Sequence, residues 1–217
     1  MFMKALCLSL LVGSLVGCRL SPIGETARLH QAVLNQKVNS VKRYIKWGAF
    51  VNSRESERGW TPLLYAAELE NYQIAEILID HGADVNMLSS EDKVSPLQRA
   101  AAKGDLRMIN LLLAHGAHID HQDNKLRSTP LMWASANSHF QAVKVLLDSG
   151  SLVDVRGNRG ESALFLAVSA QNVDIVKLLL SFNAIKDRPD IYGITPIYKA
   201  KQLGNEELVD LLSNNEL

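Results

Sequence analysis

The chain has 217 residues, of which 47% are apolar and 21% are charged. This composition is ordinary for a globular protein, and it excludes a wholly disordered chain, a collagen and a polytopic membrane protein. The 23 Lys and Arg residues balance 23 Asp and Glu residues. A general nucleic-acid binder usually carries a basic excess that neutralises phosphates, so we expect no nucleic-acid partner.

The N-terminus carries an uncharged, largely apolar run over residues 5–17, directly after Lys4. Crossing a bilayer takes about 20 residues, so this shorter run suits the apolar core of a secretory signal. It ends in Leu15-Val16-Gly17-Cys18, which resembles the lipobox of bacterial lipoproteins. The resemblance implies removal of residues 1–17 and lipidation of Cys18. A plain signal peptide cleaved nearby is the alternative.

Cysteine usage agrees with export, because Cys7 would be lost with the signal and Cys18 would carry lipid. No thiol would remain for a disulfide in an oxidising compartment. By resemblance to lipoproteins of bacteria with two membranes, Arg19 in place of Asp favours the outer membrane. We therefore expect a lipid-anchored protein of the bacterial cell envelope, in the outer membrane facing the periplasm, with residues 18–24 forming the lipidated cysteine and a short tether.

Two sequence markers recur in phase from about residue 25 onward, which is typical of a solenoid. The first marker is a hydroxyl residue followed in most copies by Pro: Thr61-Pro62-Leu63, Ser95-Pro96-Leu97, Thr129-Pro130-Leu131, Ser162-Ala163-Leu164 and Thr195-Pro196-Ile197. The second marker is a small-residue pair: Gly48-Ala49, Gly82-Ala83, Gly116-Ala117, Gly150-Ser151 and Asn183-Ala184.

Both markers predict the boundaries of helices. A Thr or Ser N-cap before Pro starts a first helix, since Pro at the first helical position loses no hydrogen bond. The second helix carries an apolar face, such as Ile74, Ile77 and Leu78, and the Gly ends it in a left-handed conformation. Asn183 replaces this Gly, because Asn tolerates positive φ. Each unit is therefore helix, turn, helix and a loop of about ten residues.

This pattern resembles the ankyrin repeat, whose signature is Thr-Pro-Leu-His at the first helix and Gly-Ala before a β-hairpin-like loop. The resemblance covers residues 25–217 and implies an all-α ankyrin-repeat solenoid of about six repeats, the outer two serving as polar caps. The expected repeats are 25–52, 53–86, 87–120, 121–154, 155–187 and 188–217.

The chain departs from the signature at two positions. The signature His is replaced by Leu64, Gln98, Met132, Phe165 and Tyr198. The Gly two residues before Thr-Pro is kept as Gly59, Gly160 and Gly193, but the middle repeats have Lys93 and Arg127. We therefore expect looser loops in the middle repeats.

The one candidate for a metal site is the group His115, His118 and His121. Three His at this spacing would be a zinc signal on a continuous helix. Gly116 is expected to end the helix directly after His115, so the three rings do not share a face. We therefore predict structural or solvent-exposed His residues and no metal or other cofactor, with a metal site as the weaker alternative.

In ankyrin stacks the concave side, formed by loop tips and first helices, usually binds the partner. Carrying this register over places one exposed residue of each first helix on that side: Tyr65, Arg99, Trp133, Leu166 and Lys199. Loop residues join them, namely Arg58, Trp60 and Tyr192. Trp, Tyr and Arg dominate interface energies, so we predict a protein-binding surface here. The alternative is that the rings pack on neighbouring loops.

Charge is uneven along the first two repeats. Residues 25–52 hold five basic residues and one acidic residue, and residues 53–86 hold two basic and seven acidic residues. Their net charges are therefore +4 (5 − 1) and −5 (2 − 7). The basic repeat could contact anionic lipid headgroups, or it could form salt bridges with the second repeat. Both alternatives stay open.

No nucleophile elbow, P-loop or metalloprotease motif occurs, so we predict no enzyme. We expect a monomeric, membrane-anchored protein–protein interaction module, an envelope scaffold or adaptor. One alternative is an immunity or inhibitor protein that neutralises a toxin or enzyme delivered into the envelope. A metal-binding envelope protein that uses the His group is a weaker alternative.

Overall fold

A computed structural model describes residues 22–213, and within this part of the chain all regular structure is helical. The first helices of the repeats are α1 (Pro22–Leu34), α3 (Pro62–Glu68), α5 (Pro96–Lys103), α7 (Pro130–Ala136), α9 (Ala163–Ser169) and α11 (Pro196–Gln202). The second helices are α2 (Val38–Lys46), α4 (Tyr72–Asp80), α6 (Leu106–Ala114), α8 (Phe140–Asp148), α10 (Val173–Ser181) and α12 (Glu206–Ser213). The predicted all-α repeat solenoid is confirmed. The predicted signal peptide and Cys18 lie outside the described residues.

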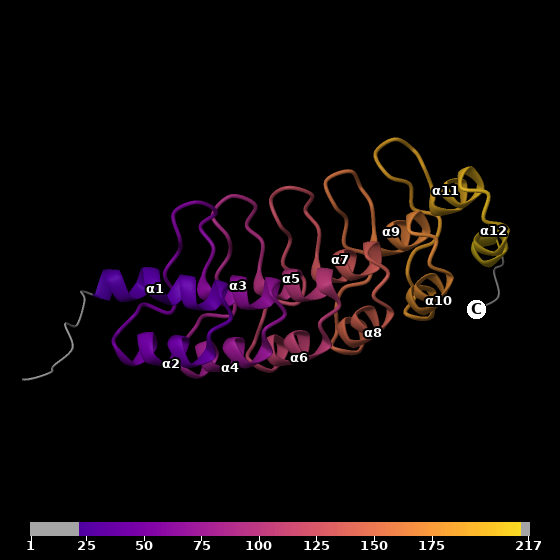
Figure 1. The fold of residues 1–217 in the computed structure, drawn as a ribbon. Coiled ribbons are helices and arrows are strands. Elements are labelled where there is room, and N and C mark those ends of the chain that lie inside the picture. Colours follow the sequence, from indigo (N-terminus) through magenta and orange to yellow (C-terminus); the bar gives the residue numbers. More distant parts are fainter. Residues whose placement is uncertain (1–21, 214–217) are drawn as a thin grey trace, which may run out of the picture.

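The helices stack in two rows (Figure 1). Each first helix packs on the first helix of the next repeat, and each second helix does the same in its own row. The long loops project beyond the row of first helices, away from the second helices. The stack therefore has a loop side, made of loops and first helices, and a second-helix side. No helix in the described part is both long and apolar enough to cross a membrane.

Local side-chain chemistry sets where the first helices begin. Thr61, Ser95, Thr129, Ser162 and Thr195 each accept a hydrogen bond from the backbone N–H three residues later. Most are followed by Pro at the first helical position, where its missing N–H has no intrahelical role. The predicted N-caps are confirmed in every one of these repeats.

The apolar core runs along the whole stack between the two rows. Leu63, Leu97, Leu131 and Leu164 occupy the same position of successive first helices and are at most 1% exposed. The small residues that follow them are also buried, among them Ala66, Ala100 and Ala134. Their size allows neighbouring first helices to approach closely. The core is continuous, so no repeat buries its apolar face alone.

Left-handed residues recur where the sequence predicts them. Asn183 has a φ of 62°, and the Gly residues at the same position of earlier repeats are also left-handed. The expectation of looser middle loops is wrong, since Lys93 and Arg127 take φ values of 52° and 53°. Hydrogen bonds between neighbouring loops, such as Asn158 N–H to the Leu126 carbonyl at 2.8 Å, hold these loops in place.

The first helix begins earlier than the sequence predicts. α1 starts at Pro22, inside the segment 18–24 that was assigned to the tether. Pro suits a first helical position because its fixed φ is already helical. The predicted lipid site at Cys18 and the folded stack are therefore only a few residues apart.

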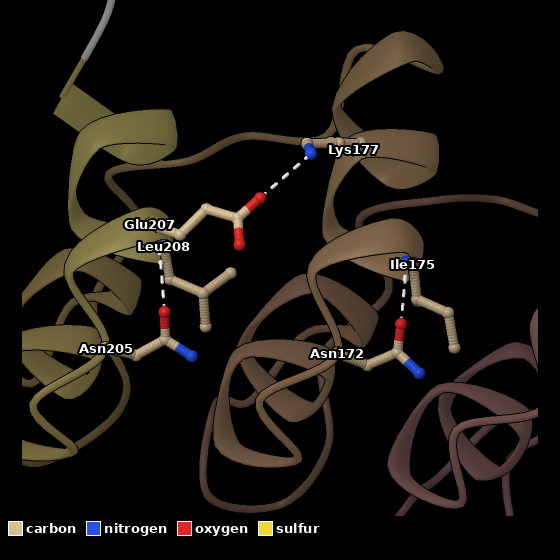
Figure 2. A network of polar contacts seen from close by, with 6 residues as sticks. All are labelled: Asn172, Ile175, Lys177, Asn205, Glu207 and Leu208. Carbon is tan, nitrogen blue, oxygen red and sulfur yellow. Dashed lines mark hydrogen bonds and ion pairs between the residues drawn. The ribbon is translucent and has the colours of Figure 1, made fainter.

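The last repeat is joined to its neighbour by an ion pair, and the two second helices are capped in the same way (Figure 2). Lys177 of α10 pairs with Glu207 of α12 at 3.1 Å. Asn172 and Asn205 cap the N-termini of these two helices through equivalent hydrogen bonds of 3.0 and 3.1 Å. Both ion-pair partners are exposed, so the contact adds little stability. Its polar character fits a terminal repeat that faces water.

Asn and Asp side chains at equivalent positions after the second helices link the first five repeats in series. Asn86 is typical, as its Nδ2 donates to the Gly116 carbonyl at 3.0 Å and its Oδ1 accepts the His118 N–H at 2.8 Å. Asn52 makes the same pair of bonds one repeat earlier. Asp120 and Asp154 stand at the same position, and their carboxylates only accept a backbone N–H of the next repeat, because Asp has no side-chain N–H to donate. This ladder was not predicted from the sequence.

We expect Asn86→Ala to lower the free energy of unfolding by about 1–2 kcal/mol, because two inter-repeat hydrogen bonds are lost together. Urea denaturation followed by circular dichroism measures the change. Asn110→Ala is the matched control, since Asn110 lies exposed on α6. Equal stability of the two variants would contradict the role assigned to the ladder.

Candidate protein-binding surface

Two neighbouring hollows lie on the loop side, between the loops and the first helices. The first has a volume of about 410 Å³ and is lined by residues of α1, the loop 54–57 and Tyr65 of α3. The second has a volume of about 280 Å³ and is lined by Arg58, Trp60, Glu68, Asp92 and Arg99 among others. Both hollows lie at the N-terminal half of the predicted binding surface.

Trp60 forms the wall of the second hollow. Its ring centre lies 5.1 Å from that of Tyr65, and the guanidinium groups of Arg99 and Arg58 lie over it at 4.8 and 5.6 Å. Only 7% of Trp60 is exposed. Trp60 is therefore a buried member of the predicted surface, because cationic side chains from its own loop and from α5 lie over its ring.

Arg99 is held above Trp60 by an acidic residue of the preceding repeat. Its Nη1 lies 3.8 Å from Glu68, which also pairs with Lys103 at 3.1 Å. These groups are partly exposed, so the pairs contribute little to stability. Their effect is positional, since they draw the guanidinium of α5 toward α3. Tyr65, Trp60 and Arg99 thereby form one cluster, which we call the Trp60 cluster.

Glu55 organises the loop that carries Trp60. Its carboxylate accepts the backbone N–H groups of Glu57, Arg58 and Trp60. Burial works to raise the pKa of Glu55, but these three N–H groups outweigh it and hold the pKa below its ordinary value. Burial, followed by the negative charge of Glu55, raises the pKa of Tyr65. Glu55 is therefore ionised and Tyr65 neutral at neutral pH.

Trp133 is fixed in a similar way two repeats later. Its indole Nε1 donates to the Asp123 carboxylate at 3.1 Å. Asp123 is only 2% exposed, and its other oxygen accepts the backbone N–H groups of Lys125 and Leu126. The ring is half-buried. Trp133 is thus held by the loop that precedes its own helix, and Trp60 is held by Tyr65 of α3 and Arg99 of α5. Both rings are fixed rather than free.

The remaining predicted contact residues differ in exposure. Leu166 and Lys199 are half-buried, and Leu166 packs against the core. Tyr192 is 70% exposed at the tip of its loop, next to Ile191 at 61%. Ile191 was not predicted from the sequence, although an apolar pair at a loop tip is a signal for contact with another molecule.

The His residues do not come together. His115 Nδ1 bonds to the Leu111 carbonyl at 2.9 Å, and His121 Nε2 bonds to the Lys93 carbonyl at 2.7 Å. His118 is exposed. In residues 22–213 no group of three or more His, Cys, Asp or Glu residues could hold a metal ion. The alternative of a metal site on these His residues is therefore not supported by the geometry.

The fold and this surface together define a helical repeat solenoid with a continuous face suited to protein–protein contact. Comparison with protein families agrees. A model described as ankyrin repeats, three copies, matches residues 4–89, 29–123, 87–157 and 131–217. The chain belongs to the ankyrin-repeat family, whose repeats serve as protein–protein interaction modules and are generally non-catalytic.

A human protein is similar to part of the chain. The 2-5A-dependent ribonuclease of Homo sapiens is 36% identical over 63 residues, which is 29% of this chain. The chain covers only 8% of the length of that protein. The similarity is therefore at the level of individual repeats.

Proposed function

We propose that this chain is an envelope scaffold or adaptor that is anchored through a lipid on Cys18 and binds another protein with its loop side. The observation that carries the proposal is the Trp60 cluster with the two hollows beside it. Its aromatic and Arg groups are of the types that dominate protein interfaces. They are also held in place before binding, which reduces the entropy lost on association.

The charge around the hollows indicates the chemistry of the partner. Glu55 and Glu57 line the first hollow, and Glu68, Glu91 and Asp92 line the second. Arg54, Arg58 and Arg99 are the only basic residues that line either one. Acidic residues therefore exceed basic ones here, in keeping with the acidic second repeat. We expect the partner to present basic side chains to this face.

Alanine at both Tyr65 and Trp133 should weaken partner capture by about thirtyfold or more, since truncating central aromatic residues removes most of an interface's energy. Capture from detergent-solubilised membranes, quantified by mass spectrometry, measures the loss. The matched control is Tyr72→Ala with Phe182→Ala, which removes two aromatic rings outside the predicted contact residues.

Unchanged capture by the Tyr65 and Trp133 double variant, with an intact circular dichroism spectrum, would rule this surface out. The identity of the captured protein separates the two roles. A toxin or enzyme recovered as the partner would favour the immunity role over the scaffold role. Labelling with palmitate, lost in Cys18→Ser, tests the anchor separately.

A further inference from the structure

The first repeat exposes basic and aromatic side chains side by side. Lys42 and Lys46 are one helical turn apart on α2, and Arg43 and Trp47 form the adjacent pair at the same spacing. All four residues are exposed, and so is Phe50 in the following loop. We call these five residues the N-terminal patch. It lies at the end of the stack where α1 and α2 are found (Figure 1).

The cations of the N-terminal patch form no ion pairs. Within residues 22–213, every salt bridge lies in the later repeats. Arg43 contacts the rings of Tyr44 and Trp47 at 5.1 and 5.2 Å. The alternative that the basic first repeat forms salt bridges with the acidic second repeat is therefore wrong. Its positive charge is available to something outside the chain.

The patch includes exposed apolar side chains, whereas a terminal repeat is expected to present a polar face to water. Trp47 is 38% exposed and Phe50 is 58% exposed. Arg43 stacks on Trp47, so cationic and aromatic groups form one surface. Lys and Arg beside Trp and Phe are typical of surfaces that lie in the interfacial region of a bilayer.

The patch also lies close to the predicted anchor. The Phe50 N–H donates to Thr26 Oγ1 at 3.0 Å, which holds this loop against the first turns of α1. α1 begins at Pro22, so the chain from Cys18 to the helix spans at most about 14 Å when extended. A bilayer that holds lipid on Cys18 is therefore within reach of the N-terminal patch.

We propose that the N-terminal patch binds the surface of an anionic bilayer, with Lys42, Arg43 and Lys46 at the lipid phosphates and Trp47 and Phe50 in the interfacial layer. The position near the membrane rests on the proposed anchoring, but the binding itself requires no lipid on the chain. Such contact fixes the stack by its first repeat. The loop side of the later repeats then stays open to the partner.

Vesicle binding by residues 22–217 tests the proposal, because every described helix and the whole core lie in this segment. Circular dichroism first verifies that it is folded. We expect binding to vesicles of equal parts phosphatidylcholine and phosphatidylglycerol, with a blue shift of Trp47 fluorescence that is absent from Trp47→Phe. Phosphatidylcholine alone should bind far more weakly, and high salt should release the protein.

Charge reversal at Lys42 and Lys46 should reduce the affinity for anionic vesicles at least about 25-fold, since each basic group near the surface contributes about fivefold. The control is Lys125→Glu with Lys201→Glu, which changes net charge equally at exposed positions of other repeats. Trp47→Ala with Phe50→Ala should weaken binding but keep its salt dependence. Leu152→Ala with Ile191→Ala is the apolar control.

Equal binding to both kinds of vesicle, or equal losses in the Lys42 and Lys46 variant and its control, would overturn the proposal. These outcomes do not bear on the proposed anchor. Palmitate labelling of Cys18 in the full chain tests the anchor separately. Conversely, absent labelling would remove the anchor and leave the vesicle result standing. The two proposals can therefore fail separately.

Discussion

Gly59→Ala should lower the free energy of unfolding by about 2–4 kcal/mol, because two costs arise at the same position. The first is the backbone, as Gly59 has a φ of 63° that L-residues adopt only with strain. The second is space, since a Cβ at Gly59 would lie 1.8 Å from Ser90 Oγ and 2.3 Å from Ser90 Cβ. Urea denaturation of the purified protein measures the sum.

Gly193→Ala separates these two costs. Gly193 occupies the same loop position with a φ of 78°, but nothing lies within 4 Å of its added Cβ. We therefore expect a loss of only about 1–2 kcal/mol there. Adding Ser90→Gly to Gly59→Ala removes the clash, so the stability of the double variant should rise close to that of Gly193→Ala. A similar loss in both single variants would show that close packing between loops is not what Gly59 provides.

Features that depend on a few neighbouring residues could be predicted from the sequence. Thr61 followed by Pro62 predicts a helix start because the cap and the helix lie within three residues of each other. Asn183 predicts a left-handed turn for a similarly local reason. The repeat period then extends each local prediction along the chain, and this is why the fold class could be predicted.

Features of the candidate site that depend on distant residues could not be predicted in this way. Trp60 is buried because Arg99, one repeat later, lies over its ring and is held there by Glu68. Nothing in the residues next to Trp60 indicates this. Lys93 likewise takes a left-handed φ where Gly is the local preference, and its carbonyl contacts His121 of the next loop. Charge counts could not decide whether basic residues of the first repeat form salt bridges with the second, since a salt bridge depends on the distance between two side chains.

Gln98, which stands at the position of the signature His, connects its own repeat to the next through its side-chain amide. The side chain is 1% exposed, and its Nε2 donates to the carbonyls of Ser128 at 2.6 Å and His121 at 3.2 Å. Its Oε1 accepts the Ser95 N–H at 2.8 Å. One amide thus joins the start of α5 to the next loop.

Gln98→Ala should lower the free energy of unfolding by about 2–4 kcal/mol, because buried carbonyl and N–H groups lose their partners. Urea denaturation measures the loss, and Gln141→Ala on the exposed face of α8 should change stability by less than about 0.5 kcal/mol. Gln98→His restores the signature residue of the family. We expect it to recover part of the loss, since an imidazole N–H can donate to one of the two carbonyls.

The Gln98→Ala variant also connects the stability of the stack to the candidate site. Ser128 closes the loop in which Asp123 holds the Trp133 indole, so losing the Gln98 amide should also free this ring. Partner capture by Gln98→Ala should therefore fall even at temperatures where the variant stays folded, and Trp133 fluorescence should shift to the red. Full capture by a destabilised Gln98→Ala would show that a fixed Trp133 is not needed for binding.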